Sequence, residues 1–180
     1  MKKLPLGIQN KNRRINVRKG CETDVPLILR LIKELAEYEK LLDQVVATEE
    51  TLREWIFVKG GAEVIIGEVD GEPVGFALFF CNFSTFLGRS GVYLEDLFVV
   101  EEKRGLGLGK AMLGYIARLA LERGYGRFEW ACLDWNEPSI KFYRSLGAVA
   151  MDDWTVYRVT GDSLNALARE WEGDKTGEDA

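Results

Sequence analysis

The chain has 180 residues, of which 47% are hydrophobic and 29% charged, and its formal net charge is −5 at pH 7. This length and composition are typical of one globular domain with a sizeable core, and the negative charge argues against a nucleic-acid partner. No run of about 18 apolar residues is present, so we expect no membrane span and no membrane partner. Because the first residues lack the apolar core of a signal peptide, we expect a cytoplasmic protein.

The residue types that are missing narrow the chemistry further. The chain has no histidine, which excludes Ser-His and Cys-His mechanisms and histidine metal sites. Its three cysteines, Cys21, Cys81 and Cys132, are widely spaced, which favours reduced thiols over a disulfide or zinc framework. We therefore expect no metal, and acid–base chemistry must come from Tyr, Glu, Asp, Lys, Cys or water.

The N-terminal part begins with a basic segment and continues into a strand and two helices. Residues 1–14 carry five basic and no acidic side chains, and we expect a flexible leader or a loosely docked arm. Residues 15–19 form a short strand. Asp24 is a plausible cap for the helix that follows it, because apolar side chains then recur at helical spacing. Thr48 caps a second, shorter helix over residues 48–57.

The next part of the chain has the pattern of a hairpin followed by a loop. Residues 62–69 and 74–83 form two strands, which are joined by the turn sequence Asp70-Gly71-Glu72-Pro73. Residues 82–92 contain two glycines, and we expect them to form a loop.

Residues 93–110 form the segment around which the rest of the chain is organised. Residues 93–100 are aromatic or apolar apart from the pair Glu95-Asp96, which is typical of a strand buried on both faces. A glycine-rich loop follows, and a helical apolar pattern begins after Gly109. A strand, a glycine loop and a helix in this order direct unpaired backbone N–H groups and the positive end of the helix dipole at one point. We expect a phosphate site there.

The type of phosphate site follows from the spacing of the glycines. A Walker A loop needs four residues between its first glycine and its Gly-Lys pair, and Ser or Thr after that pair. Here only three residues separate Gly105 from Gly109, and Ala111 follows Lys110. The dinucleotide motif G-x-G-x-x-G also fails, because Lys110 occupies the third glycine position. Arg104, Gly107 and Gly109 instead form Arg-x-x-Gly-x-Gly, which resembles the pyrophosphate-binding motif of the GNAT acetyltransferases.

The C-terminal part completes an alternating series of strands and helices. Residues 128–133 are expected to form a strand, 136–146 a helix, 154–159 a last strand and 163–171 a C-terminal helix. The element order, β-α-α-β-β-β-α-β-α-β-α, predicts an α/β or α+β fold with a mixed sheet. It is also the order of the GNAT fold, which implies a twisted, mostly antiparallel sheet of six to seven strands flanked by helices.

Because no linker or internal repeat is present, we expect a single domain over residues 15–172, with a flexible tail over residues 173–180.

Glu95 and Asp96 are the first candidates for chemistry. Adjacent strand residues point to opposite faces, so Glu95 should share a face with Leu97, and Asp96 with Leu94 and Phe98. Because burying an unpaired carboxylate is costly, each should meet a cation, a donor or a solvent-filled cleft. The two alternatives are a structural salt bridge and a negative surface that receives a cationic substrate.

The helix over residues 136–146 holds the second group of candidates. Asn136 or Glu137 begins this helix, and Pro138 is tolerated in its first turn. Tyr143 lies three residues from both Ile140 and Leu146, so it faces inward with them. From spacing alone, Tyr143 is either a core residue with a satisfied hydroxyl or a catalytic acid.

Three segments in register resemble the spermidine/spermine acetyltransferases and their bacterial relatives that acetylate diamines and lysine analogues. They are residues 31–39, 93–96 and 136–143, within a similarity that runs from about Ile15 to Ala168. The resemblance implies an acetyl-CoA-dependent N-acetyltransferase for a primary amine of a small cationic acceptor, working as a homodimer. Phe86 stands where polyamine-specific members tend to carry tryptophan, so the acceptor remains open among a diamine, a polyamine and a lysine analogue.

The resemblance also implies a role for each matching position. Tyr143 would be the general acid that protonates the coenzyme A thiolate. Because alkylamines are mostly protonated at pH 7, the attacking amine must lose a proton, and Glu95 can accept it through water. The residues implied in cofactor binding are Leu97, Phe98, Val99, Arg104, Gly105, Leu106, Gly107, Leu108, Gly109, Lys110, Asn136, Glu137, Pro138 and Ser139. The residues implied in amine binding are Tyr38, Glu39, Glu95, Asp96, Glu129, Trp130 and Ala131.

Two other functions remain open from the sequence. A protein or peptide acetyltransferase of the same superfamily would need an open groove rather than an acidic pocket. A catalytically silent acyl-CoA-binding sensor would not need the tyrosine, so the presence of Tyr143 favours an enzyme.

Overall fold

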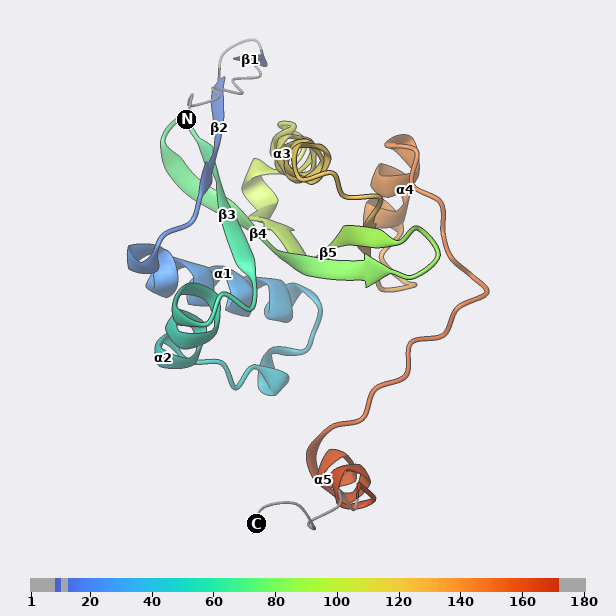
Figure 1. Cartoon of the computed structure of the whole chain (residues 1–180). Helices are drawn as coiled ribbons and strands as arrows, with labels where there is room; N and C mark the ends of the chain where they lie inside the picture. The colour runs from blue at the N-terminus through green and yellow to red at the C-terminus, as the bar shows by residue number, and fades with distance from the viewer. Residues whose placement is uncertain (1–8, 11–12, 172–180) are drawn as a thin grey trace. The chain divides into compact units, whose positions relative to one another are not determined.

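The computed structural model describes residues 9–10 and 13–171. The chain divides into two compact units between Ala131 and Cys132. The first unit contains a sheet with helices on both of its faces, and the second contains two helices (Figure 1). Among the described residues, no helix has the length and apolar character needed to cross a membrane.

The first unit is built on a six-stranded sheet whose strands follow one another in chain order. The strands are β1 (Gln9–Asn10), β2 (Arg13–Lys19), β3 (Glu63–Val69), β4 (Glu72–Ser84), β5 (Arg89–Val99) and β6 (Phe128–Trp130). Neighbouring strands are antiparallel except for β5 and β6, which are parallel. The predicted mixed, mostly antiparallel sheet is therefore confirmed.

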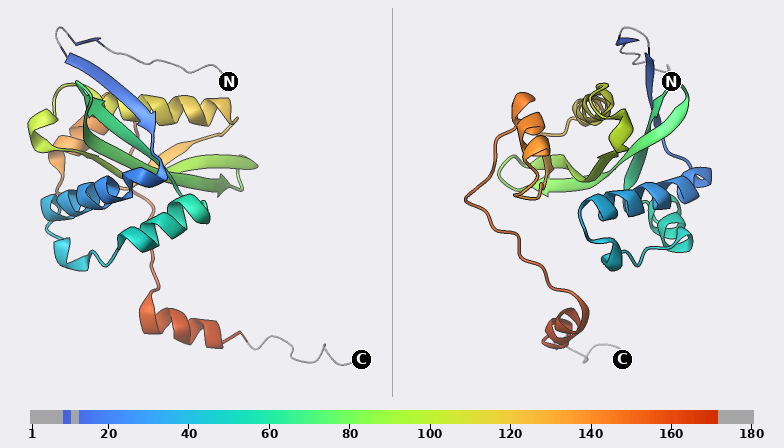
Figure 2. Two further views of the ribbon diagram at one scale, coloured as in Figure 1. Left: turned by 90° about the vertical axis from the view of Figure 1, so that its left-hand side faces the viewer. Right: turned by 180° about the vertical axis from the view of Figure 1, so that it is seen from behind.

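Helices cover both faces of this sheet. Helices α1 (Val25–Tyr38) and α2 (Glu49–Leu52) lie on one face, and α3 (Leu108–Glu122) lies on the other (Figure 2). Thr48 caps α2 as expected, because its Oγ1 accepts a hydrogen bond of 3.2 Å from the Thr51 N–H. The chain then continues as a π-helical segment over Arg53–Val58.

The core lies between the sheet and these helices. On the α1 face, Ile28 and Leu31 pack with Phe76 and Phe98, and all four side chains are buried. On the α3 face, a Cβ atom added at Gly67 would lie only 2.8 Å from the sulfur of Met112. The missing side chain therefore lets α3 pack closely against the sheet.

The predicted loop over residues 82–92 is wrong. Its two ends are paired strands, with Asn82 opposite Gly91 and Ser84 opposite Arg89, so only four residues form the turn. A Cβ atom at Gly91 would lie 2.6 Å from Oδ1 of Asn82. Gly91 is therefore required for close packing within a strand, which the sequence pattern does not distinguish from a loop glycine.

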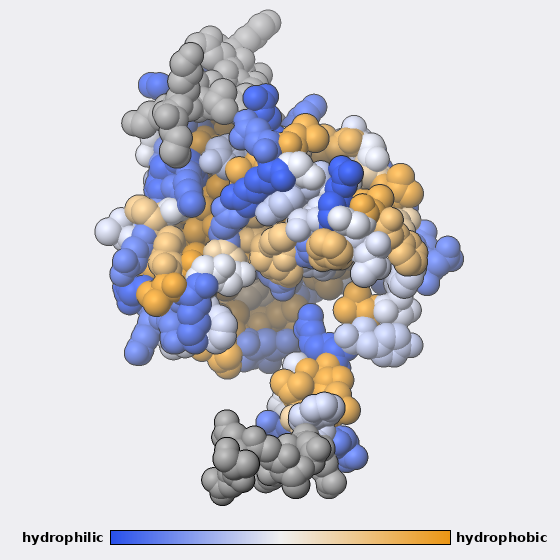
Figure 3. All heavy atoms as spheres, viewed as in Figure 1, coloured by the Kyte–Doolittle hydropathy of each residue, from blue (hydrophilic) through white to orange (hydrophobic). Residues whose placement is uncertain are grey.

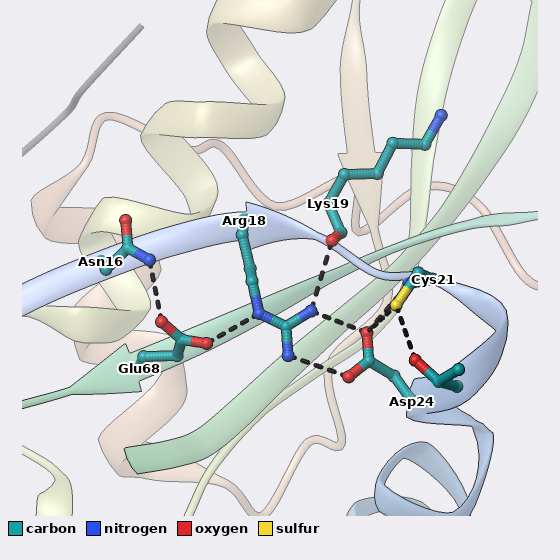
Figure 4. Close-up of polar contacts among 7 residues, drawn as sticks. Asn16, Arg18, Lys19, Cys21, Asp24 and Glu68 are labelled. Carbon is teal, nitrogen blue, oxygen red and sulfur yellow. Dashed lines mark hydrogen bonds and ion pairs between the residues drawn. The ribbon is translucent and has the colours of Figure 1, made fainter. Parts of the chain in front are cut away.

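Asp24 occupies the N-cap position of α1, as predicted, but its side chain forms no capping hydrogen bond with this helix. Its carboxylate instead accepts hydrogen bonds from Nη1 and Nη2 of Arg18 at 2.7 and 2.8 Å and from the Cys21 N–H (Figure 4). Nε of Arg18 donates to Glu68 on β3 at 2.7 Å. The Arg18 guanidinium holds the pKa of Asp24 well below its usual range. This network ties β2, β3 and the start of α1 together.

The second unit contains α4 (Glu137–Ser145) and α5 (Gly161–Arg169), close to the predicted ranges. Asn136 caps α4, since its Oδ1 accepts a hydrogen bond of 3.4 Å from the Ser139 N–H. The strand predicted over residues 154–159 is wrong, because this segment pairs with no strand among the described residues. Its β-branched and aromatic residues favour extended backbone, but a strand also requires a hydrogen-bonded neighbour.

The other predicted boundaries differ more modestly. Arg13 and Arg14 belong to β2, so the sheet begins inside the range expected for the basic leader. Strand β6 ends at Trp130, three residues before its predicted end. Of the leader, residues 1–8 and 11–12 lie outside the described residues, as does the predicted tail over 173–180.

On the face shown in Figure 3, hydrophilic and hydrophobic side chains of the described residues are mixed. In the first unit, the exposed aromatic side chains include Trp55, Phe83 and Phe86. Phe86 lies in the turn between β4 and β5, and Phe83 lies on β4 just before this turn.

Candidate active site

A β-bulge places Glu95 and Asp96 on β5. Leu94 pairs with Phe79 and Asp96 pairs with the preceding residue of β4, Leu78, so Glu95 is an extra residue without its own partner. Strict alternation therefore fails: Leu94 and Asp96 point to opposite faces of the sheet. Asp96 still shares the α1 face with Phe98, as predicted, because their β4 partners are two residues apart.

The same strand has an unpaired edge beyond the bulge. β6 pairs with β5 only from Val92 to Leu94. No strand among the described residues pairs with Leu97, Phe98 or Val99 on the side away from β4. An unpaired edge offers backbone N–H and C=O groups to an extended ligand, as another strand would. The three residues predicted to bind the pantetheine arm lie on this edge, where the carbonyl oxygen of Val99 already accepts a hydrogen bond from Nε of Arg104.

The glycine loop leaves space at the N-terminus of α3. Gly105 and Gly107 have φ angles of +74° and +95°, a region that glycine adopts without strain. A Cβ atom at Gly105 would meet nothing within 4 Å, and one at Gly107 would meet only Ile15, at 3.9 Å. No acidic side chain occupies the first turn of α3, so nothing there opposes an anion at the positive end of the helix. These features fit a phosphate group.

Three carboxylates gather where α1 ends and β5 bulges. Glu39 directly follows α1, Glu95 is the bulged residue, and Asp96 is partly buried next to it. Burial, and then the charges of Glu95 and Glu39, raise the pKa of Asp96 to about 6. Burial also raises the pKa of Glu39. Within residues 13–171, none of the three carboxylates forms an ion pair with Lys or Arg, so the structure favours a negative surface over a structural salt bridge.

Two predicted residues of the amine pocket have contacts that the sequence did not indicate. The ring centroid of Tyr38 lies 4.5 Å from Cζ of Arg104, which was expected to face the cofactor. Glu129 accepts a hydrogen bond of 2.8 Å from Nδ2 of Asn82 and forms an ion pair with Arg127. Its charge is thus already compensated. The contacts of Tyr38 with Arg104 and of Glu129 with Asn82 have no local sequence signal, because each joins residues that are distant in the chain.

The remaining predicted site residues lie at the end of the sheet or in the second unit. Trp130 packs edge-on against Phe128, with ring centroids 5.1 Å apart, and Ala131 follows β6. Asn136, Glu137, Pro138 and Ser139 form the start of α4. Tyr143 lies on the same helix, with its ring centroid 5.4 Å from that of Phe142. The cofactor and acid roles of these residues stay predictions.

The sequence that contains this bulged strand and glycine loop matches a known protein family. The model of the acetyltransferase (GNAT) family matches residues 29–148. The chain therefore belongs to the GNAT family, and it is an acetyltransferase enzyme.

The chain is also similar to individual proteins of known activity or structure. Over 164 residues the chain is 38% identical to the thialysine N-epsilon-acetyltransferase of Sus scrofa, covering 84% of this chain and 96% of the relative. It is 31% identical to the L-ornithine N5-acetyltransferase of Arabidopsis thaliana, covering 84% and 86%. Among solved structures, an integron cassette protein from the mobile metagenome of V. cholerae has 26% identity and a TM-score of 0.72, covering 86% and 98%.

Proposed function

We propose that this enzyme transfers an acetyl group from acetyl-CoA to a primary amine of a small acceptor that carries a second positive charge, such as a diamine or a lysine analogue. The observation that carries the proposal is the group formed by Glu39, Glu95 and Asp96. None of these carboxylates forms an ion pair with Lys or Arg among residues 13–171. Burial raises the pKa of Asp96 and Glu39, and the charges of Glu95 and Glu39 raise that of Asp96 further, so the group favours a bound ammonium. The relatives named for thialysine and L-ornithine support the same class of acceptor.

The residues of the first unit fit acetyl-CoA as the donor. The open loop over residues 105–107 and the N-terminus of α3 suit its pyrophosphate, and the unpaired edge of β5 suits its pantetheine arm. When bound, acetyl-CoA supplies a thioester that an amine can attack directly. No covalent enzyme intermediate is needed, which agrees with the absence of a Ser-His or Cys-His pair.

The residues of the chain then have two tasks, binding and proton transfer. Alkylamines are mostly protonated at pH 7, so the attacking amine must lose a proton while the distal ammonium keeps its charge. In this proposal Glu95, exposed on the bulge, accepts the first proton through water, and Asp96 with Glu39 holds the distal ammonium. We propose Tyr143 as the donor to the leaving thiolate, on the strength of the sequence resemblance.

Release of free coenzyme A thiol, measured against a panel of amines, tests this function. The panel contains 1,4-diaminobutane, L-ornithine, a lysine-containing basic peptide and a neutral amino sugar. We expect thiol release with the first two and little with the others. Turnover of the peptide alone would indicate a protein acetyltransferase, and acetyl-CoA binding without turnover of any amine would indicate a sensor. Either result would contradict the proposal.

The assembly is proposed from the same resemblance. We expect a two-fold homodimer, since the related enzymes are dimers and the first unit exposes Trp55, Phe83 and Phe86. Light scattering at micromolar concentration measures the mass directly, and a monomer mass would contradict this expectation.

A further inference from the structure

Arg104 joins three parts of the first unit that the reaction would use separately. Its Nε donates a hydrogen bond of 2.9 Å to the carbonyl oxygen of Val99, at the end of β5. Its Cζ lies 4.5 Å from the ring centroid of Tyr38, the last residue of α1, and 5.7 Å from that of Phe98. Arg104 is itself the residue immediately before Gly105, the first glycine of the loop.

The shape of a guanidinium group allows these contacts to exist together. The group is planar, so its face can lie on an aromatic ring while its edge donates hydrogen bonds. One edge position is used by the Val99 carbonyl. Arg104 forms no ion pair with any carboxylate in residues 13–171, and it is exposed. Its Nη groups can therefore still approach an anion without leaving Tyr38.

The contact between Arg104 and Tyr38 also affects the carboxylates, because of where Tyr38 lies in the chain. Tyr38 immediately precedes Glu39, whose charge contributes to the raised pKa of Asp96. A residue that fixes the Tyr38 ring therefore also fixes the end of α1 that carries part of the carboxylate group. If Arg104 moved together with the glycine loop, it would displace this end of α1 and the carboxylate of Glu39 with it.

We propose that Arg104 is a positioning residue that couples donor binding to amine binding. A diphosphate held at the glycine loop draws the Nη groups of Arg104, which fixes its plane on Tyr38 and thereby fixes Glu39 beside Asp96. The acceptor is then bound more tightly when the donor is present, and by linkage the donor is bound more tightly when the acceptor is present. The inference rests on the proposed function, because it assumes that both ligands bind.

The test measures the dissociation constant of 1,4-diaminobutane by calorimetry, with and without saturating coenzyme A. The ratio of the two constants is the coupling factor, and we expect at least about fivefold, the lower end of common allosteric couplings. Arg104→Lys keeps the positive charge but loses the planar face and the Nε–carbonyl bond. It should retain most of the coenzyme A affinity and lose the coupling.

Two further variants separate coupling from loss of structure. Tyr38→Phe keeps the ring and should keep the coupling, whereas Tyr38→Leu removes the ring and should lose it. Arg118→Lys is the matched control, because Arg118 pairs with Glu122 on the exposed surface of α3, away from the loop. It should change neither dissociation constant nor their ratio.

The outcomes distinguish this inference from the proposed function. If the wild-type chain binds neither coenzyme A nor the diamine, the proposed function is wrong. If it binds both with a ratio of one, or if Arg104→Lys and Tyr38→Leu keep the wild-type ratio, the positioning role of Arg104 is wrong while the proposed function stands.

Discussion

The raised pKa of Asp96 predicts that this carboxylate destabilises the folded protein at neutral pH. In the unfolded chain Asp96 titrates at its ordinary value of 3.8, and in the folded protein at about 6. Because one pKa unit corresponds to about 1.4 kcal/mol, the charged carboxylate costs about 3 kcal/mol of folding free energy well above pH 6. Asp96→Asn keeps the shape of the side chain and removes the charge, so it should be the more stable protein at pH 8.

The sign and the pH window follow from proton linkage. Between pH 4 and pH 6 the folded state binds more protons than the unfolded state, so stability falls as pH rises through this window. The stability gained by Asp96→Asn should therefore be about 3 kcal/mol at pH 8 and about half of that at pH 5, and it should vanish by about pH 3. Urea unfolding of both proteins at several pH values measures this difference.

A neighbouring variant provides the control. Burial is the first cause of the raised pKa of Asp96, and the charge of Glu95 comes second. Glu95→Gln should therefore keep most of the pH dependence of stability. If Asp96→Asn is less stable than the parent at pH 8, or if its stability difference is the same at every pH, the description of this carboxylate as buried and unpaired is refuted.

Three further predictions concern the glycine loop, the helix α4 of the second unit and the ion pair of strand β2. Gly107→Ala and its control Gly124→Ala both place alanine at a positive φ angle with no Cβ contact closer than 3.9 Å, so each should lower the folding stability by about 1–2 kcal/mol. Calorimetry should show lost coenzyme A affinity only for Gly107→Ala. Tyr143→Phe should lower kcat by roughly 10²–10⁴ with donor affinity unchanged, and steady-state kinetics within twofold of the parent would assign Tyr143 to the core. Arg18→Leu leaves the carboxylate of Asp24 unpaired, so it should lower the free energy of unfolding, measured in urea, by about 3 kcal/mol at pH 7 and by less below pH 4. An unchanged unfolding midpoint would contradict a stabilising role for the Arg18–Asp24 pair.

Much of the fold could be predicted because its signals are local. The strand β2 and the helices α1 and α3 each have their own apolar period, and β3 is a short apolar run that ends at a turn sequence. The failures occur where a residue's role depends on a distant neighbour. Gly91 packs against Asn82 across a strand pair, and the segment over residues 154–159 has the propensity of a strand but no partner among the described residues.

The candidate site divides in the same way. The glycine loop and the acidic pair were evident, since each is a short run of unusual composition. The bulge at Glu95 was not, because a strand with an extra residue has the same sequence pattern as a regular one. The contact between Tyr38 and Arg104 spans 66 positions of the sequence, and no periodicity relates them.

The central claim is that this acetyltransferase uses its carboxylates to select an amine with a second positive charge. The most direct test compares kcat/KM for 1,4-diaminobutane with kcat/KM for butylamine, which has the same carbon chain and one amine fewer. A charged hydrogen bond contributes about 1.5–3 kcal/mol, so the diamine should be preferred more than tenfold. Equal values for the two amines, or a preference for butylamine, would contradict the account.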